Sequence, residues 1–185
     1  MVWRIIARWL AGSPEMVRWI KRSAMERPYF NLPGYMDRWW LLPGAAANDP
    51  KSQYRPPRWL AWLPVSIRLH YIRRPDNDRH LHDHPCDFRS IILRGYYAET
   101  RRELYAMSDY GTKPEYRNKT IWRTAGSTYF ARAQDFHSIT AMPATGVWTL
   151  FIMHQTPGPG WNRWGFLVDG KKIPWREYLK EKENE

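Results

Sequence analysis

The chain has little cysteine and a shortage of acidic residues. Cys86 is the single cysteine among 185 residues, which excludes an internal disulfide framework and favours a reducing compartment, the cytoplasm. No apolar run approaches the roughly 20 residues of a membrane-spanning helix, so we expect no transmembrane segment. Acidic residues number 18 against 29 basic ones, a formal net charge of +11. This excess favours anionic partners such as nucleic acid, nucleotides, phosphorylated metabolites or an acidic membrane, without choosing among them.

Aromatic residues, in contrast, are abundant. The chain has 12 tryptophans, 11 tyrosines and 6 phenylalanines, and such side chains can fill a core or line a deep pocket. A length of 185 residues predicts one domain with a hydrophobic core of its own. The sequence shows no internal repeat.

Residues 1–64 are predicted to form a helical, proline- and tryptophan-rich extension packed on the core. Apolar residues recur at helical spacing over residues 2–12, while Arg8 interrupts the apolar centre that a signal peptide would need. Ser13 and Pro14 are typical of a capped helix start, which predicts a second helix from Pro14 to about Met25. A basic amphipathic helix can also lie on a membrane surface. We favour packing on the domain.

Seven prolines between residues 27 and 64 leave little room for long regular elements. In this part of the chain we expect only a short helix at Tyr35–Leu42. The polar stretch Asn48–Pro57 is predicted to be a mobile loop.

From residue 66 the apolar period changes from helical spacing to two. Ile67, Leu69 and Tyr71 share one face of an extended segment, and further short strand-like runs follow at close intervals, separated by Gly, Pro, Asn and Asp. This pattern predicts an all-β sandwich or barrel over residues 65–170. Ile173-Pro174 then opens a short helix, so residues 171–185 are expected to form a C-terminal helix and a charged tail.

Three histidines at alternate positions suggest a metal site. His80, His82 and His84 lie in the segment RHLHDHP, directly before the strand-like run RSIILRGYYAE. Alternate side chains of an extended segment share a face, so these imidazoles can converge. Neutral imidazole is the commonest protein ligand for transition metals. A histidine-rich loop without metal is the alternative.

The spacing around these histidines resembles the two motifs of the cupin superfamily. His82-Asp83-His84-Pro85 fits the first motif, with Gly95 eleven residues after His84, and Gly126 to His137 fits the second. The resemblance covers about residues 66–155 and implies a jelly-roll, double-stranded β-helix. It also implies a metal ion held by His82, His84 and His137. The segments LHDHP and WTLF are similar to those of phage and bacterial cupin-like proteins.

The acidic ligand of the first cupin motif has no direct counterpart. It would fall near Phe88, which cannot bind metal, so a strand bulge would be needed to turn Asp87 inward as a fourth ligand. Without that bulge the site has three histidines, as in the thiol-dioxygenase branch of cupins. A second register pairs His80 with His82 and places Asp87 at the acidic position. In the preferred register, His80 instead supports the site or faces the substrate.

The resemblance implies non-haem metal chemistry. Fe(II) is the preferred ion, with Zn, Mn or Ni as alternatives, because ligand type alone does not select a metal. Three neutral histidines leave two positive charges on Fe(II), which favours an anionic or thiolate substrate. The His-x-Asp pair usual in 2-oxoglutarate enzymes is missing. Arg89 is a candidate clamp for a carboxylate or phosphate, or else forms a surface ion pair, and Tyr97 is a candidate pocket wall.

Three functions follow from these features. The favoured one is a metal-dependent cupin enzyme, a non-haem iron oxygenase acting on a small anionic or nucleotide-like substrate. The second is a nucleic-acid-directed protein that modifies or binds bases, using aromatic stacking and the basic surface. The third is a non-catalytic cupin that binds a metal or ligand. The oligomeric state is not predicted.

Overall fold

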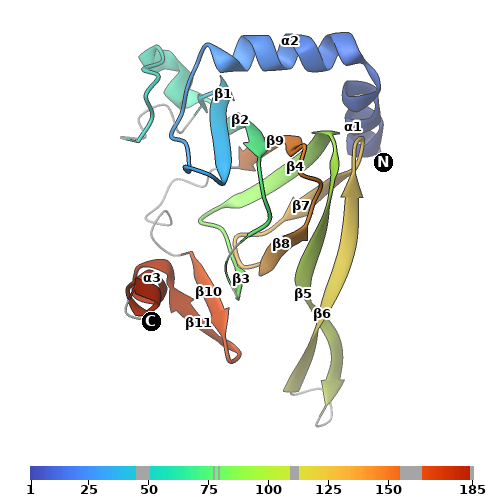
Figure 1. Ribbon diagram of the computed structural model, residues 1–185, viewed down its shortest axis with the longest axis vertical. Coiled ribbons are helices and arrows are strands. Elements are labelled where there is room, and N and C mark those ends of the chain that lie inside the picture. Colours follow the sequence, from blue (N-terminus) through green and yellow to red (C-terminus); the bar gives the residue numbers. More distant parts are fainter. Residues whose placement is uncertain (45–50, 77, 79, 109–112, 155–163, 184–185) are drawn as a thin grey trace.

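The computed structural model describes residues 1–44, 51–76, 78, 80–108, 113–154 and 164–183. Two antiparallel sheets form the core (Figure 1). The five-stranded sheet has the order β1 (Met36–Leu42), β2 (Val65–Ile72), β9 (Val147–His154), β4 (Asp87–Arg94) and β7 (Thr128–Ala131). The six-stranded sheet has the order β11 (Lys171–Pro174), β10 (Gly165–Val168), β3 (Leu81–His82), β8 (His137–Ala141), β5 (Tyr96–Ser108) and β6 (Lys113–Thr124).

The two sheets face each other as in a jelly roll. Side chains from the inner faces of both sheets meet between them: the ring of Phe88 on β4 lies 6.0 Å from that of His137 on β8. Alternation along each strand sends one set of residues into this space and the other set outward. The predicted all-β jelly-roll core is confirmed.

Two N-terminal helices cover the outer face of the five-stranded sheet. They are α1 (Val2–Gly12) and α2 (Pro14–Met25) (Figure 1). The Ser13 hydroxyl accepts a hydrogen bond from the Met16 amide and so caps the start of α2. Val17 and Ile20 of α2 are buried in one apolar cluster with Leu69 of β2 and Leu150 of β9. These helices therefore pack on the five-stranded sheet through their apolar residues.

The predicted helix at Tyr35–Leu42 is wrong. This segment forms β1, an edge strand that pairs antiparallel with β2, so the N-terminal extension contributes to the core sheet. Strand pairing places Trp40 in the interior, fully buried, where its indole N–H donates to the Ser52 hydroxyl. Tertiary burial of a large aromatic side chain overrides a weak local helix preference.

The remaining elements flank the sheets. A 3₁₀ helix spans Arg58–Trp62. The segment in which Ile173-Pro174 was expected to open a helix begins instead with the strand β11, and α3 (Trp175–Glu183) follows directly after Pro174. Strands β5 and β6 pair along a long hairpin that extends beyond the body of the molecule (Figure 1). Residues 48–50 of the predicted mobile loop lie outside the described residues. Among the helices that the structure describes, none is long and apolar enough to cross a membrane.

Truncation of Ile20 tests the contact between α2 and the sheet. Ile20 is 2% exposed, so Ile20→Ala should lower the free energy of unfolding by about 2–4 kcal/mol through lost burial and a residual cavity. Trp19 is 59% exposed, and Trp19→Ala should change the free energy of unfolding by less than about 0.5 kcal/mol. Urea unfolding measures both values. Equal small effects would contradict the packing of α2 on the core.

Candidate metal centre

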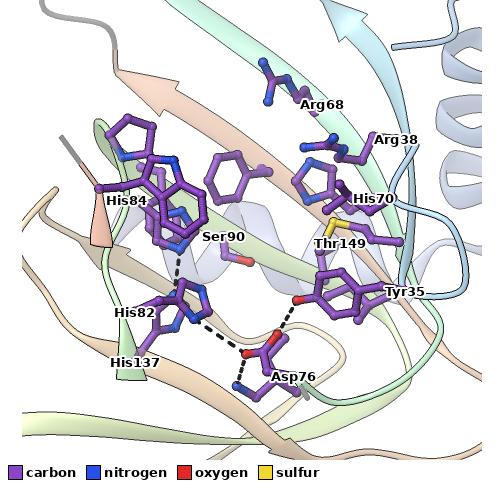
Figure 2. Close-up of a pocket in the computed structure, with 18 of the residues that line it drawn as sticks. Tyr35, Arg38, Arg68, His70, Asp76, His82, His84, Ser90, His137 and Thr149 are labelled. Atoms are coloured by element: carbon purple, nitrogen blue, oxygen red, sulfur yellow. Dashed lines mark hydrogen bonds and ion pairs between the residues drawn. The ribbon is translucent and has the colours of Figure 1, made fainter. Parts of the chain in front are cut away.

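Three histidines from separate segments converge between the sheets (Figure 2). His82 of β3 pairs in register with His137 of β8, and His84 follows in the next loop, where its amide donates to the carbonyl of Ala133. Each imidazole offers one ligand nitrogen, and these atoms lie within 4.8 Å of one another. The structure thus brings together the three residues predicted as the preferred ligands, whose metal-binding role stays a prediction.

The geometry of the three rings fits a small transition-metal ion. The Nε2 atoms of His84 and His137 are 2.7 Å apart. Two nitrogens bound to one ion at about 2.1 Å lie roughly 3 Å apart at a right angle, so a small opening of this pair would accommodate an ion. The Nδ1 atom of His82 is buried without a hydrogen-bond partner among the described residues.

Burial keeps His82 and His84 in the neutral form that binds metal. Burial lowers the pKa of His82 to about 4, and the nearby charge of Asp76 offsets only part of this effect. Burial also lowers the pKa of His84 well below its usual value, with further contributions from His137 and His82. Neutral imidazole carries the free lone pair that an ion requires.

A buried carboxylate orients the third histidine. Glu99 of β5 is fully buried, and its Oε1 accepts a hydrogen bond from the Nδ1–H of His137 at 2.7 Å. Burial alone would raise the pKa of Glu99, but the hydrogen bond from His137 and the charges of Arg123 and Arg101 outweigh it and lower that pKa to about 2. With Nδ1 donating to a carboxylate, the Nε2 lone pair of His137 points into the site.

Other carboxylates fix the surrounding segments. Asp76 accepts a hydrogen bond from the amide of Ile139 and another from the hydroxyl of Tyr35, and its Oδ2 lies 3.9 Å from Nδ1 of His82. Asp83, between the two motif histidines, accepts from the amide of Gly165 at 2.7 Å. The chain is thereby tied to β8 before His82 and to β10 directly after it.

Asp87, predicted as a possible fourth ligand, does not join the histidine group. Its Oδ1 accepts a hydrogen bond from the amide of Ala133 at 2.8 Å, which fastens the loop after β7. Phe88 instead points inward and packs against His84 with the ring centroids 4.6 Å apart. The strand therefore runs without the bulge that would turn Asp87 toward the other ligands.

The other predicted site residues have different surroundings. Arg89 lies on the outer face of β4, with its guanidinium 4.7 Å from the ring of Trp3, and so cannot act as a clamp in the interior. His80 lies 3.1 Å from the hydroxyl of Tyr178 on α3, and the described cavity lining does not include it. Tyr97 is buried and does line the cavity.

Glu99 and Asp76 were not identified as site residues from the sequence. A period of two along β5 places Tyr97, Glu99 and Arg101 on one face, which is the available sequence signal for Glu99. Asp76 lies in an irregular segment, so no periodicity could assign its direction.

The histidines line one part of a cavity of about 770 Å³ between the two sheets. Its walls are mainly aromatic and apolar, with a few polar groups, a composition typical of small-molecule sites. Phe88, Phe151 and Ile139 contribute apolar wall near the histidines. The arrangement can hold one ion beside a chamber large enough for a small organic molecule.

Comparisons with known proteins found similar solved structures at low sequence identity. A single-residue variant of oxalate decarboxylase from Bacillus subtilis aligns with 84% of this chain at 12% identity and a TM-score of 0.48. Hydroxypropylphosphonic acid epoxidase from S. wedmorenis aligns with 71% of this chain and 56% of its own at 13% identity and a TM-score of 0.44. This chain spans 32% of the oxalate decarboxylase chain. No protein-family model and no curated protein matches.

The jelly-roll fold that the resemblance to cupins implies is confirmed by the two facing antiparallel sheets. The three histidines that come together between these sheets stand at the positions that the two motifs indicated.

Substitution of Glu99 tests how the site is oriented. Glu99→Gln keeps the size of the side chain but removes the charge that balances Arg123 and favours the required tautomer of His137. We expect Zn(II) affinity to fall about 10–100-fold. Glu103→Gln, on the more exposed part of the same strand, is the matched control. Competition with a chromophoric chelator measures the Zn(II) affinity of the two variants. An unchanged affinity in Glu99→Gln would contradict the orienting role of Glu99.

The free energy of unfolding of the metal-free protein should fall as the pH drops from about 6.5 toward 4. The folded state resists protonation of His82, so the unfolded state binds more protons between about pH 6.5 and pH 4. Above this range the imidazole of His82 is neutral in the folded and in the unfolded protein. His82 alone would contribute about 2 kcal/mol of loss at pH 5.

Urea unfolding at pH 7.5 and pH 5 measures this change. His82→Leu should reduce it, whereas His154→Leu, at an exposed position, should leave it intact. Equal free energies of unfolding for the unsubstituted protein at the two pH values would refute the buried neutral imidazole.

Proposed function

We propose that this protein is a metal-dependent oxygenase that holds non-haem Fe(II) with His82, His84 and His137. The observation that carries the proposal is the convergence of three imidazoles at the wall of a large, mostly apolar cavity. Three protein ligands leave coordination positions open, as catalytic metal sites require. When bound, Fe(II) would supply the redox chemistry for dioxygen.

The residues around the histidines have defined tasks in this proposal. Glu99 holds the tautomer of His137, and Asp76 and Asp83 hold the segments that position His82 and His84. Phe88 and Phe151 exclude water from the space beside the histidines. A small anionic or nucleotide-like substrate is the proposed reactant, since no carboxylate ligand would neutralise the charge of the ion.

The metal itself is part of the proposal. Oxalate decarboxylase from Bacillus subtilis is described with Mn(II) centres, so Mn is an alternative to Fe, and Zn or Ni would also suit imidazole ligands. A non-catalytic metal-binding role is the competing function.

Nucleic-acid binding also stays a proposal. It is favoured by the long β5–β6 hairpin, where Arg102 lies 4.1 Å from the ring of Tyr116 and Arg117 lies 4.6 Å from that of Tyr105. Such exposed basic and aromatic pairs suit stacking on bases. A cytoplasmic location stays a prediction.

Elemental analysis and a dioxygen analogue test the proposal. Protein purified without added metal should contain iron approaching one equivalent, and its Fe(II) form should bind nitric oxide with the electron paramagnetic resonance signal of high-spin iron nitrosyl. His84→Ala and His137→Ala should each lower the iron content at least tenfold, because two imidazoles hold an ion poorly. His154→Ala, at an exposed position, is the control and should retain iron.

The outcomes separate the competing functions. Native zinc, or bound iron that does not take up nitric oxide, would overturn the oxygenase and favour a structural or hydrolytic role. Protein that retains no transition metal after purification or reconstitution would overturn any role for a metal.

A further inference from the structure

The charged residues that line the cavity separate into two groups. The acidic ones lie beside the histidines: Asp76 is 3.9 Å from His82, the charge of Asp78 acts on His82, and Asp83, which pairs with Lys172, is its neighbour in sequence. The arginines of the lining, Arg38 and Arg68, come from β1 and β2 at the other side of the cavity (Figure 2). The one lysine described in the lining, Lys51, lies 5.8 Å from the ring of Phe30, whose carbonyl accepts from Arg38. The cavity is therefore polarised, with the candidate metal ligands at one end and guanidinium groups at the other.

Strand register brings the two arginines and a fourth lining histidine together. Arg38 of β1 is the cross-strand partner of His70 on β2, and Arg68 precedes His70 by two residues, on the same inner face. Figure 2 shows the three side chains as neighbours. The charges of both arginines, after burial, lower the pKa of His70 well below its usual value, which is consistent with this proximity.

His70 carries a buried polar atom that the protein does not satisfy. The residue is 6% exposed, and its Nε2 atom has no hydrogen-bond partner among the described residues. Buried polar atoms are almost always paired, so an orphaned one that faces a cavity indicates a ligand group. As a neutral imidazole, His70 can donate from Nε2 to an oxygen atom.

The arginines are held in position before any ligand arrives. The guanidinium of Arg68 lies 3.8 Å from the ring of Tyr29 and 4.4 Å from that of Trp40. The Nε of Arg38 donates to the carbonyl of Phe30 at 2.6 Å. Stacking and a hydrogen bond to Nε both fix the plane of a guanidinium, which reduces the entropy cost of anion binding.

An apolar wall connects the two ends of the cavity. The ring of Phe151 lies 5.8 Å from that of His84 and 5.0 Å from that of His70. The two histidine rings are therefore no farther apart than these two distances together, a span that a single small molecule can bridge. The part of the ligand beside Phe151 would have to be apolar or aromatic.

We propose that the substrate is an elongated molecule with an apolar body whose far end carries a carboxylate or phosphate bound by Arg38, Arg68 and His70. The inference rests on the proposed function, because it takes the histidine end of the cavity as the reacting end. Arginine pairs match both oxyanions, since the planar guanidinium can donate two parallel hydrogen bonds to either. The opposite end of the same molecule lies beside His82, His84 and His137.

Binding of matched probes tests this subsite. The probes are 3-phenylpropanoate, 2-phenylethyl phosphate and the neutral 3-phenylpropanamide, measured by titration calorimetry on metal-free and Zn(II)-loaded protein. At least one of the two anions should bind ten times more tightly than the amide in both forms. The anion that binds more tightly identifies the oxyanion class.

Substitutions locate the binding groups. Arg68→Met and Arg38→Met should each weaken anion binding at least tenfold and leave Zn(II) stoichiometry unchanged. Arg68→Lys should weaken anion binding less than Arg68→Met does. Arg18→Met, at an exposed position on α2, is the control and should bind anions normally. If Arg68→Met does not fold, Arg38→Met and Arg68→Lys decide the result.

Failures of the subsite and of the metal site are distinguishable. Equal affinity for anion and amide, or anion binding that depends on Zn(II) and is insensitive to both arginine substitutions, would overturn the subsite even if the metal is retained. If the metal-free protein binds the anion and the arginine substitutions abolish this binding, the subsite is supported even if the oxygenase proposal fails.

Discussion

The candidate site depends on one register: His82 of β3 opposite His137 of β8. β3 has only two residues, so little of its own pairing energy fixes that register. Hydrogen bonds from outside the strand supply the constraint. Asp83 accepts from the amide of Gly165 on β10, and Asp76 accepts from the amide of Ile139 on β8. These carboxylates make the histidine positions a consequence of the whole six-stranded sheet.

The interior between the two sheets holds buried side chains of both charges. Glu99 is buried with Arg123 and His137, so its negative charge is balanced where it lies. Arg68 is buried on the opposite sheet against aromatic faces. Glu99 and Arg68 thus lie on opposite sheets, and the rings of Phe88 and Phe151, 4.4 Å apart, line the cavity between those sheets.

The sequence predicted the parts of the structure that depend on local spacing. Period-two alternation grouped His82 with His84, the resemblance to the two cupin motifs added His137, and Ser13-Pro14 placed the start of α2. The sequence did not predict the segments in which burial decides between two local conformations or between two faces of a strand. The aromatic run around Trp40 is compatible with a helix or a strand, and its pairing with β2 decides for the strand. Arg89 could be assigned a face only once β4 was known to have no bulge at Asp87.

The absence of a bulge at Asp87 has a chemical consequence. Phe88, 1% exposed, occupies the inward position where the cupin motif would place an acidic ligand, and Asp87 instead fastens Ala133. Negative charge is therefore moved from direct contact with an ion to Glu99, one hydrogen bond beyond His137. A carboxylate at that distance raises the basicity of the imidazole but neutralises less of the charge on a bound cation. The remaining positive charge favours anionic ligands at the histidine end, as the arginines do at the other.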